Sequence, residues 1–260
     1  MFRGCACEVG KHEPRLATTS FSHTTSAVLH LCSREKNNKM AQDLTSTSAG
    51  RDSDYLRRAY ALDGAPAAQE LYDQWANAYD NDLNAMDYQS PQRAVEAVLR
   101  HLNHDNDKEV TILDAGCGTG MVGTCFASSS LQSRFVIDGL DLSEGMLAVS
   151  RKKNVYRHLD VANLDEPLKQ QEGAYNVVTC VGTLTKGHVG PKVFREFVRV
   201  TARGGLVVAT VHNDVWVSGG YEKEVEDLRA AAVVDVLSTD EFGIVQDSTT
   251  GGRMVVLQKR

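Results

Sequence analysis

The stretch VTILDAGCGTGMVG, residues 110–123, decides the fold of this chain. Its first four residues are apolar or β-branched, a run that is long enough for a buried strand and too short for a helix. Asp114 ends this strand, and three glycines then alternate with other residues: Gly116, Gly118 and Gly120. Glycine permits turns that are closed to other residues and lets a ligand lie against the main chain. Residues 121–127 predict a helix whose free N–H groups point back at the turn, so the stretch predicts a nucleotide-type site.

The residues around the turn indicate which nucleotide it binds. Gly118, Gly120 and Gly123 fit the dinucleotide pattern G-x-G-x-x-G, which is a weak signal alone. A dinucleotide carries a pyrophosphate, and Asp114 at the mouth of the turn would repel it. A ligand with an ammonium and a sulfonium would be attracted instead. No Gly-Lys-Ser/Thr follows, which excludes a P-loop.

Asp114, Gly116, Gly118 and Gly120 match the pattern acid-x-Gly-x-Gly-x-Gly position by position. This pattern resembles motif I of the class I S-adenosylmethionine (SAM)-dependent methyltransferases. The resemblance implies that SAM is the cofactor and that these four residues and Cys117 form its binding turn. It also implies an α/β, three-layer Rossmann-like fold. The expected seven-stranded sheet has the order 3-2-1-4-5-7-6, with an antiparallel last strand.

Asp141 is the second predicted cofactor ligand. It ends the predicted strand 135–140 and lies 18 residues after Gly123, near the interval at which a ribose-binding acid is expected. A carboxylate there can accept hydrogen bonds from both ribose hydroxyls. The alternative is a helix N-cap for the segment that starts at Leu142. The run DLSEGML also resembles the family, which implies that Leu142 and Met146 line the adenine pocket.

The third predicted strand, 155–159, is followed by Asp160 and Val161. The resemblance implies that Asp160 accepts a hydrogen bond from the adenine amino group and that Val161 makes a backbone contact. The alternative is that Asp160 is a solvated loop residue.

A helix from Pro66 to about Asp80 precedes the sheet. Leu71, Trp75 and Tyr79 recur at helical spacing and give it an apolar, aromatic face. One interpretation is a stripe that packs on the domain. The other, which the resemblance favours, is a lid over SAM in which Tyr72 and Tyr79 face the ligand.

The rest of the chain predicts the remaining sheet. A fourth strand is expected at 175–181, where Asn176 replaces the family's usual Asp at a structural position. A fifth is expected at 206–211, a helix at 222–237 and a closing hairpin at 242–247 and 253–258. His188 and His212 fall near the carboxyl ends of strands four and five, so they are candidate general bases, or else ordinary loop histidines. The sequence shows no obvious carboxylate cluster for a metal.

Composition limits the substrate class. Of 28 Lys/Arg and 34 Asp/Glu, residues 1–39 contain six and three, which leaves 22 basic against 31 acidic side chains in the rest. An acidic body disfavours nucleic acid, because phosphate contacts dominate that affinity. No apolar run approaches the ~18 residues of a membrane helix. A small-molecule substrate is therefore expected, in a cytoplasmic protein of undetermined oligomeric state.

Residues 1–66 are rich in Ser, Thr and charge, and we expect most of them to be a disordered leader before a domain at 67–260. The leader is either a mitochondrial transit peptide or a tail, with translation starting at Met40 in the second case.

The chain also resembles the Williams–Beuren-region methyltransferase-like proteins, which share Val-Gly-x-Leu followed by Gly-His-Val, here residues 181–184 and 187–189. Small-molecule methyltransferases of fungal secondary metabolism look similar. The prediction is a SAM-dependent methyltransferase of a small molecule, such as a secondary metabolite. The alternatives are a protein methyltransferase, a SAM-binding protein that does not methylate, and a nicotinamide enzyme, which Asp114 disfavours.

Overall fold

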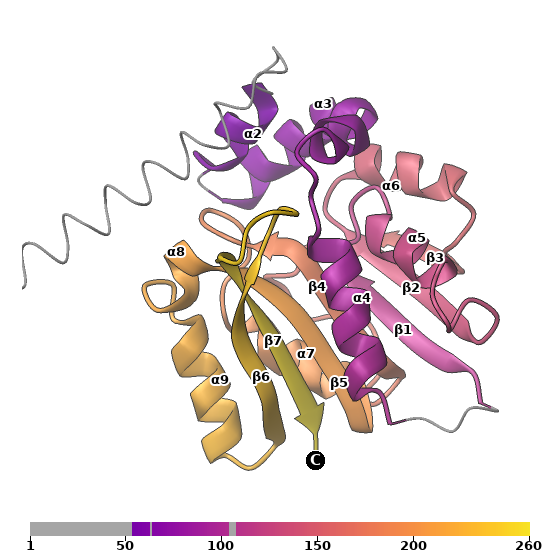
Figure 1. The fold of residues 1–260 in the computed structure, drawn as a ribbon, viewed down its shortest axis with the longest axis vertical. Helices are drawn as coiled ribbons and strands as arrows, with labels where there is room; N and C mark the ends of the chain where they lie inside the picture. Colours follow the sequence, from indigo (N-terminus) through magenta and orange to yellow (C-terminus); the bar gives the residue numbers. More distant parts are fainter. Residues whose placement is uncertain (1–53, 63, 104–107) are drawn as a thin grey trace, which may run out of the picture. The chain divides into compact units, whose positions relative to one another are not determined.

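Seven strands form one sheet in the order β3-β2-β1-β4-β5-β7-β6, as predicted (Figure 1). The computed structural model describes residues 54–62, 64–103 and 108–260. Strands β1 to β5 run parallel, and β7 pairs antiparallel with both β5 and β6. The strands are β1 Val110–Ala115, β2 Phe135–Asp141, β3 His158–Val161, β4 Tyr175–Leu184, β5 Thr201–His212, β6 Val234–Gly243 and β7 Gly251–Lys259.

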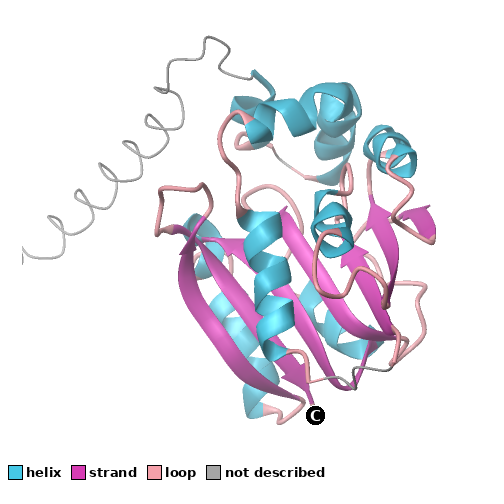
Figure 2. Cartoon of the chain, turned by 45° about the vertical axis from the view of Figure 1, so that its right-hand side comes forward, coloured by secondary structure: helices cyan, strands magenta, loops and turns pink. Residues whose placement is uncertain are grey.

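Helices cover both faces of the sheet (Figures 1 and 2). They are α2 Asp54–Ala59, α3 Ala65–Asn84, α4 Ser90–His101, α5 Met121–Ala127, α6 Glu144–Lys152, α7 Val193–Val200, α8 Asn213–Trp216 and α9 Tyr221–Ala230. One core lies under α4 and α5, where Val98 and Phe126 are fully buried against β1. The other lies under α7 and α9, around the buried Phe194 and Phe197. Two covered faces explain why the central strands read as continuous apolar runs.

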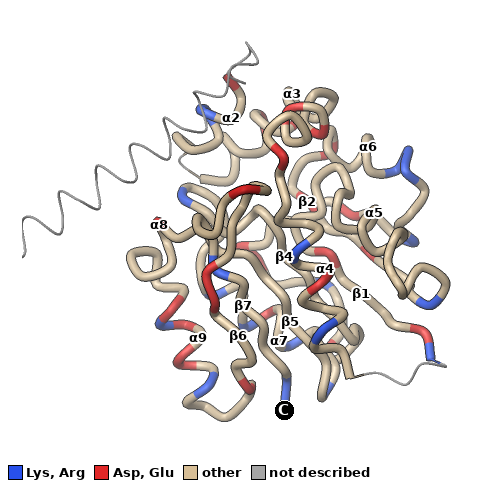
Figure 3. The backbone as a smooth tube through the Cα atoms, viewed as in Figure 1, with Lys and Arg blue, Asp and Glu red and all other residues tan. Residues whose placement is uncertain are grey.

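Helices α2 and α3 lie over the edge of the sheet at which the parallel strands end (Figures 1 and 2). Leu71 and Trp75 of α3 are 2% and 1% exposed and form a small third core with Ala59 of α2. Helix α2 falls within the segment expected to be a leader, and residues 1–53 lie outside the described part of the chain. Acidic and basic residues are interspersed along α9, which packs on the sheet through its buried apolar side chains (Figure 3). No helix in the described ranges is long and apolar enough to cross a membrane.

Some element boundaries differ from the prediction. Helix α9 stops at Ala230 instead of 237, and the strand predicted at 242–247 is β6, which begins at Val234. Strand β6 pairs with β7 and has mostly half-buried or exposed side chains, so its sequence lacks the continuous apolar run of the central strands. Strand β3 lies two to three residues later than predicted, at His158–Val161. Strand β5 begins at Thr201, five residues before the predicted start at 206.

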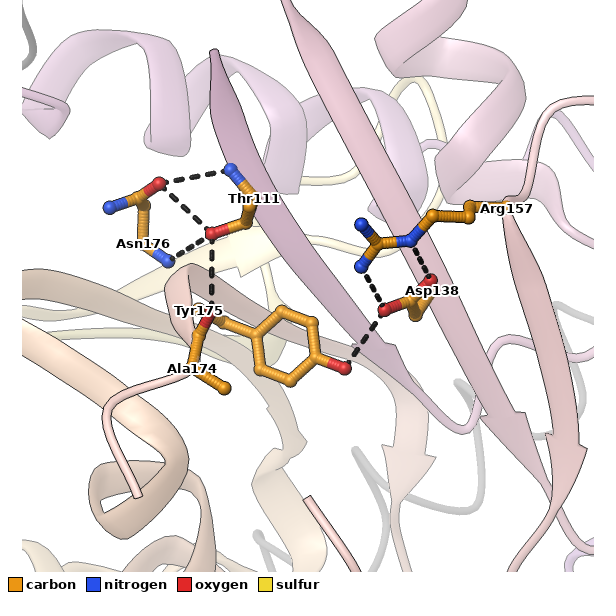
Figure 4. Close-up of polar contacts among 6 residues, drawn as sticks. All are labelled: Thr111, Asp138, Arg157, Ala174, Tyr175 and Asn176. Carbon is orange, nitrogen blue, oxygen red and sulfur yellow. Dashed lines mark hydrogen bonds and ion pairs between the residues drawn. The ribbon is translucent and has the colours of Figure 1, made fainter. Parts of the chain in front are cut away.

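Asn176 has the structural role that was predicted for it. Its side-chain oxygen accepts hydrogen bonds from the backbone amide and the hydroxyl of Thr111, at 2.9 and 3.0 Å. The backbone amide of Asn176 donates to the same hydroxyl at 3.1 Å. Nearby, Arg157 and Tyr175 both donate to the Asp138 carboxylate, which joins β2, β4 and the start of β3 (Figure 4). Thr111 and Asn176 lie at the beginning of β1 and β4. Asn in place of the family's usual Asp therefore lies far from the carboxyl ends of the strands, where the glycine turn is.

Candidate cofactor and substrate site

The glycine turn after β1 has the backbone geometry that its sequence predicts. Gly116, Gly118 and Gly120 have φ values of 74°, 53° and 87°, in the left-handed region that favours glycine. A Cβ on Gly116 would lie 2.2 Å from the Thr183 hydroxyl, so β4 packs directly against the turn. A Cβ on Gly118 would meet nothing within 4 Å. The turn is therefore closed at Gly116 and open at Gly118, where a ligand can approach the main chain.

Asp141 joins the ends of β1 and β2. Its Oδ2 accepts the amide of Gly118 at 2.8 Å, and its Oδ1 accepts the amide of Ser143 at 2.9 Å. Burial raises the pKa of Asp141, and these backbone hydrogen bonds oppose that shift. A carboxylate has about four acceptor positions, and the amides of Gly118, Ser143 and Leu142 use about three of them, so about one stays available for a ligand. The N-cap of the following helix is Ser143, whose hydroxyl accepts the amide of Met146 at 3.0 Å, so Asp141 is not the N-cap residue.

Asp114 lies behind the turn instead of at its mouth, which corrects the expectation from the sequence. It is fully buried, and its two oxygens accept the hydroxyls of Tyr156 at 2.7 Å and Thr179 at 2.9 Å. Burial raises its pKa to about 6, although both hydroxyls act in the opposite direction. The Asp114 carboxylate can therefore act on a ligand at the turn only through its electric field.

A cavity of about 90 Å³ lies between the glycine turn, the end of β2 and helix α3. Seven of the predicted cofactor residues line it: Tyr72, Tyr79, Gly116, Gly118, Asp141, Leu142 and Met146. None of the described residues in its wall is Lys or Arg, so a pyrophosphate would find no side-chain cation there. The wall therefore suits a ligand with a ribose and a positive charge and disfavours a dinucleotide.

Five predicted residues do not line this cavity. Cys117 and Gly120 are buried beneath the turn with Asp114, and Gly120 lies against the side chains of Ser150 and Tyr156. Asp160 and Val161 are exposed. Both belong to the last residues of β3, the strand at the edge of the sheet. The residues that reach the cavity from this segment come next in the chain and were not predicted: Ala162, Asn163, Leu164 and Asp165. Thr183, near the carboxyl end of β4, also lines the cavity.

Helix α3 combines both roles that its sequence allowed. Its buried stripe packs on the domain through Leu71 and Trp75. Tyr72 stacks on Trp75 with ring centroids 6.0 Å apart, and Tyr79 meets Trp75 edge-on at 4.7 Å. Both tyrosines also line the cavity beside the glycine turn. The aromatic stripe thus fixes the positions of two phenol groups over the site.

A second cavity of about 100 Å³ adjoins the first. Tyr72, Tyr79, Gly182 and His188 line both, so they form the shared wall. His188 of the loop after β4 is thereby brought to the junction, while His212 at the end of β5 lines only the second cavity. The two candidate bases therefore differ in position, and His188 lies nearer to the cofactor residues.

The hydrogen bonds of His188 define its tautomer. Its Nδ1 is 2.9 Å from the carbonyl oxygen of Lys186, which can only accept, so Nδ1 carries the proton. Burial lowers the pKa of His188, which favours the neutral ring with a free electron pair on Nε2. The Tyr72 hydroxyl lies 2.9 Å from Nε2 and therefore donates to it. His188 is thus poised as a proton acceptor at the wall between the cavities.

His212 has a different environment. Its Nδ1 accepts the amide of Asp214 at 3.3 Å and lies 3.6 Å from the carboxylate of that residue. Burial lowers the pKa of His212, and Asp214 acts against this shift. Its ring meets the ring of Tyr60 edge-on at 5.8 Å. These contacts place it in the far wall of the second cavity.

Comparison with known proteins is consistent with this geometry. Residues 112–205 match the family described as "Methyltransferase domain". Human methyltransferase-like protein 27 is 35% identical over 160 residues, which cover 61% of this chain and 63% of the human protein. This chain therefore spans less than two thirds of that relative.

Two solved structures are similar in fold. The cyclase SpnF has a TM-score of 0.56 at 17% identity, over 76% of this chain and 97% of that one. The magnesium protoporphyrin IX methyltransferase of Synechocystis PCC 6803, solved with bound S-adenosylhomocysteine (SAH), has a TM-score of 0.54 at 15% identity, over 75% and 99%. At such identities the likeness concerns the fold alone.

Proposed function

We propose, from the premise that the chain carries a class I SAM-dependent methyltransferase domain, that this protein transfers a methyl group from SAM to a small molecule. The observation that supports this most is the shared wall of the two cavities. The first cavity contains the residues that suit SAM, and the second opens from it beside His188. A donor and an acceptor bound in the two cavities would meet at Tyr72, Tyr79, Gly182 and His188.

In this proposal each part of the first cavity holds one part of SAM. Asp141 accepts hydrogen bonds from the ribose hydroxyls, and Leu142 and Met146 contact the adenine. The open backbone at Gly118 faces the amino-acid part. Asn163 replaces Asp160 as the side chain nearest the adenine edge, because Asn163 lines the cavity and Asp160 is exposed.

SAM would supply an activated methyl group and a neutral thioether as the leaving group. The protein aligns the acceptor atom with the donor and keeps water out, and positioning alone can contribute ~7–11 kcal/mol. Helix α3 closes the top of the first cavity with Tyr72 and Tyr79, which supports both tasks. His188 takes the acceptor's proton at Nε2. Where the acceptor does not reach His188, the Tyr72 hydroxyl passes the proton on to Nε2.

A second candidate is a protein that binds SAM without methylating. A fold neighbour of this chain is named as a cyclase, so the fold also occurs in enzymes named for other reactions. A protein substrate would be the third candidate. The walled, mostly apolar second cavity favours a small molecule over a peptide segment.

The test begins with calorimetric titration of the full chain with SAM. Asp141→Ala should weaken binding by roughly 1.5–3 kcal/mol, because charged hydrogen bonds are lost. Asp160→Ala is the matched control and should leave the affinity unchanged, whereas Asn163→Ala should reduce it. Equal losses in the Asp141 and Asp160 variants would contradict this arrangement, and no binding at high micromolar SAM would end the proposal.

Incubation with SAM and a metabolite extract then separates the candidates. Accumulation of SAH together with a product 14 mass units heavier, about one CH₂, identifies methylation. Binding of SAM without SAH accumulation would favour the second candidate.

A further inference from the structure

The second cavity has a wall of aromatic and neutral groups. Five rings of its wall come from α2, α3 and the segments that follow them: Tyr60, Tyr72, Trp75, Tyr79 and Tyr88. Leu83, Leu184 and Ile244 add apolar surface. None of the described residues that line it is Lys, Arg, Asp or Glu. Among the described lining residues, the side chains that titrate near neutrality are therefore His188 and His212.

Both histidines are held in the neutral form. Burial lowers the pKa of each, and the nearest acid to His212, Asp214, lies 55% exposed outside the wall. Burial also raises the pKa of Tyr72 and Tyr79, with Asp141 acting from the cofactor side in the same direction. The wall thus carries no charge at neutral pH, while it keeps hydroxyl groups at Ser90, Thr210 and Tyr88.

An ion would be poorly placed in this cavity. Burial of a charge without a partner is costly, and the described wall offers an anion no cation. A cationic acceptor would lie next to the sulfonium of the proposed cofactor, and the two positive charges would repel each other. Cation–π attraction of ~2 kcal/mol or more acts in the opposite direction, and it has to overcome both this repulsion and the lost hydration of the cation. An uncharged, flat molecule loses little on transfer and gains contact with the rings.

We infer that the second cavity selects an uncharged aromatic acceptor that carries a hydroxyl or a ring N–H. This inference rests on the proposed function and specifies its substrate class. The cavity volume, about 100 Å³, compares with the ~150 Å³ apolar cavity that takes up benzene, so one ring fills most of it. A larger acceptor would extend through the shared wall or toward the exposed Tyr60.

The transfer step balances with the groups present. The acceptor oxygen forms a bond to the methyl carbon, and the carbon–sulfur bond breaks with its electron pair remaining on sulfur. The acceptor proton passes to the Tyr72 oxygen as the Tyr72 proton passes to Nε2 of His188, 2.9 Å away. The products are a methyl ether, neutral SAH and a protonated His188 that returns its proton to water.

The experiment compares three probes of one shape on the full chain saturated with SAH: 2-naphthol, 2-naphthoate and 2-naphthylmethylammonium. Calorimetry should show 2-naphthol binding at least about tenfold more tightly than either ion, because only the ions lose hydration without a partner. The one-ring series p-cresol, p-toluate and 4-methylbenzylammonium should show the same order. A charged probe that binds as tightly as the phenol, or no binding in both series, overturns the inference.

Two variants assign the binding to this cavity. Ile244→Trp fills it and should abolish 2-naphthol binding, with SAH affinity unchanged because Ile244 does not line the first cavity. Ile244→Arg should reverse the preference toward 2-naphthoate. Val217→Trp, at a 68% exposed position, is the control and should change neither affinity.

Thermal unfolding and SAH titration confirm that each variant is folded. If SAH binds but the probes show no charge preference, this inference fails alone. If SAH does not bind, the proposed function fails with it.

Discussion

Asp73 on helix α3 is hydrogen-bonded to Ser143, the N-cap residue of helix α6. Its Oδ1 accepts the Ser143 hydroxyl at 2.5 Å and also the amide of Gly145 at 2.9 Å. About two turns further along α3, Asp80 accepts hydrogen bonds from the Thr119 hydroxyl at 2.5 Å and from the ammonium of Lys153 at 2.6 Å. Helix α3 is therefore tied to the glycine turn and to α6, the two elements that build the proposed cofactor cavity.

Removal of one tie should loosen the lid and weaken cofactor binding. We expect Asp73→Ala to raise the Kd for SAM about three- to tenfold, equivalent to about 1 kcal/mol for a partly exposed contact. Amide hydrogen exchange in α3 should accelerate in the same variant. Glu70→Ala is the matched control, because the exposed Glu70 carboxylate accepts a hydrogen bond from Gln74 of the same helix. Equal affinities in both variants would show that α3 does not act as a lid.

The two glycines of the turn should respond differently to a methyl group. Gly116→Ala places a Cβ 2.2 Å from Thr183 at a φ of 74°, so it should lower the unfolding midpoint strongly. Gly118→Ala meets open space, so it should cost only about 1–2 kcal/mol of backbone strain and still fold. Its methyl group would occupy the ligand's place, and SAM binding should be lost. Calorimetry on the folded Gly118 variant checks this, and retained SAM affinity would place the ligand elsewhere.

The sequence was sufficient for the centre of the sheet. Strands β1, β2 and β4 are covered on both sides by helices, so their apolar runs are unambiguous, and motif I fixes the order around them. The edge strands were harder to predict. β6 pairs on one side only and has mostly half-buried or exposed side chains, so no long apolar run marks it as a strand.

The shift of β3 explains why Asp160 does not line the first cavity. A strand that ends at residue 161 carries Asp160 outward, and the next residues reach the cavity instead. Side chains alternate between faces of a strand, so an error of one or two residues changes which of them face the site. Nothing within the short run at 155–161 fixes that register.

The partners of Asp114 could not be predicted either. Tyr156 and Thr179 lie 42 and 65 residues away in sequence and meet it only through the stacking of β1, β4 and the segment before β3. The motif predicts that an acid stands there, but its direction is a tertiary property.

If His188 is the base, the reaction rate should depend on its protonation. Burial lowers the pKa of His188, so the neutral ring should dominate at neutral pH, and kcat/KM should fall only below its ordinary range near 6.5. We expect His188→Gln to lower kcat by about 10²- to 10⁴-fold and to remove the acid limb of the pH profile. Tyr72→Phe should lower kcat less and keep the limb. An unchanged limb in the Gln variant would assign it to another group, and His212→Gln would then be tested.

Asp114 should make the stability of the fold depend on pH. Its folded-state pKa of about 6 lies above the ordinary 3.8, so the folded protein binds this proton more tightly than the unfolded chain. The resulting stabilisation is complete below pH 4 and is lost as the pH rises through 6. The loss amounts to roughly 3 kcal/mol at most for a shift of about two units.

Asp114→Asn removes this dependence, since the amide does not titrate. The free energy of unfolding of the variant minus that of the natural protein should therefore increase between pH 4 and 7, whatever the constant cost of altered contacts to Tyr156 and Thr179. Urea denaturation at four pH values measures this difference, and Glu222→Gln on the surface of α9 provides the baseline. A difference that stays flat or decreases across this range would mean that the two hydroxyls outweigh burial and keep the carboxylate ionised.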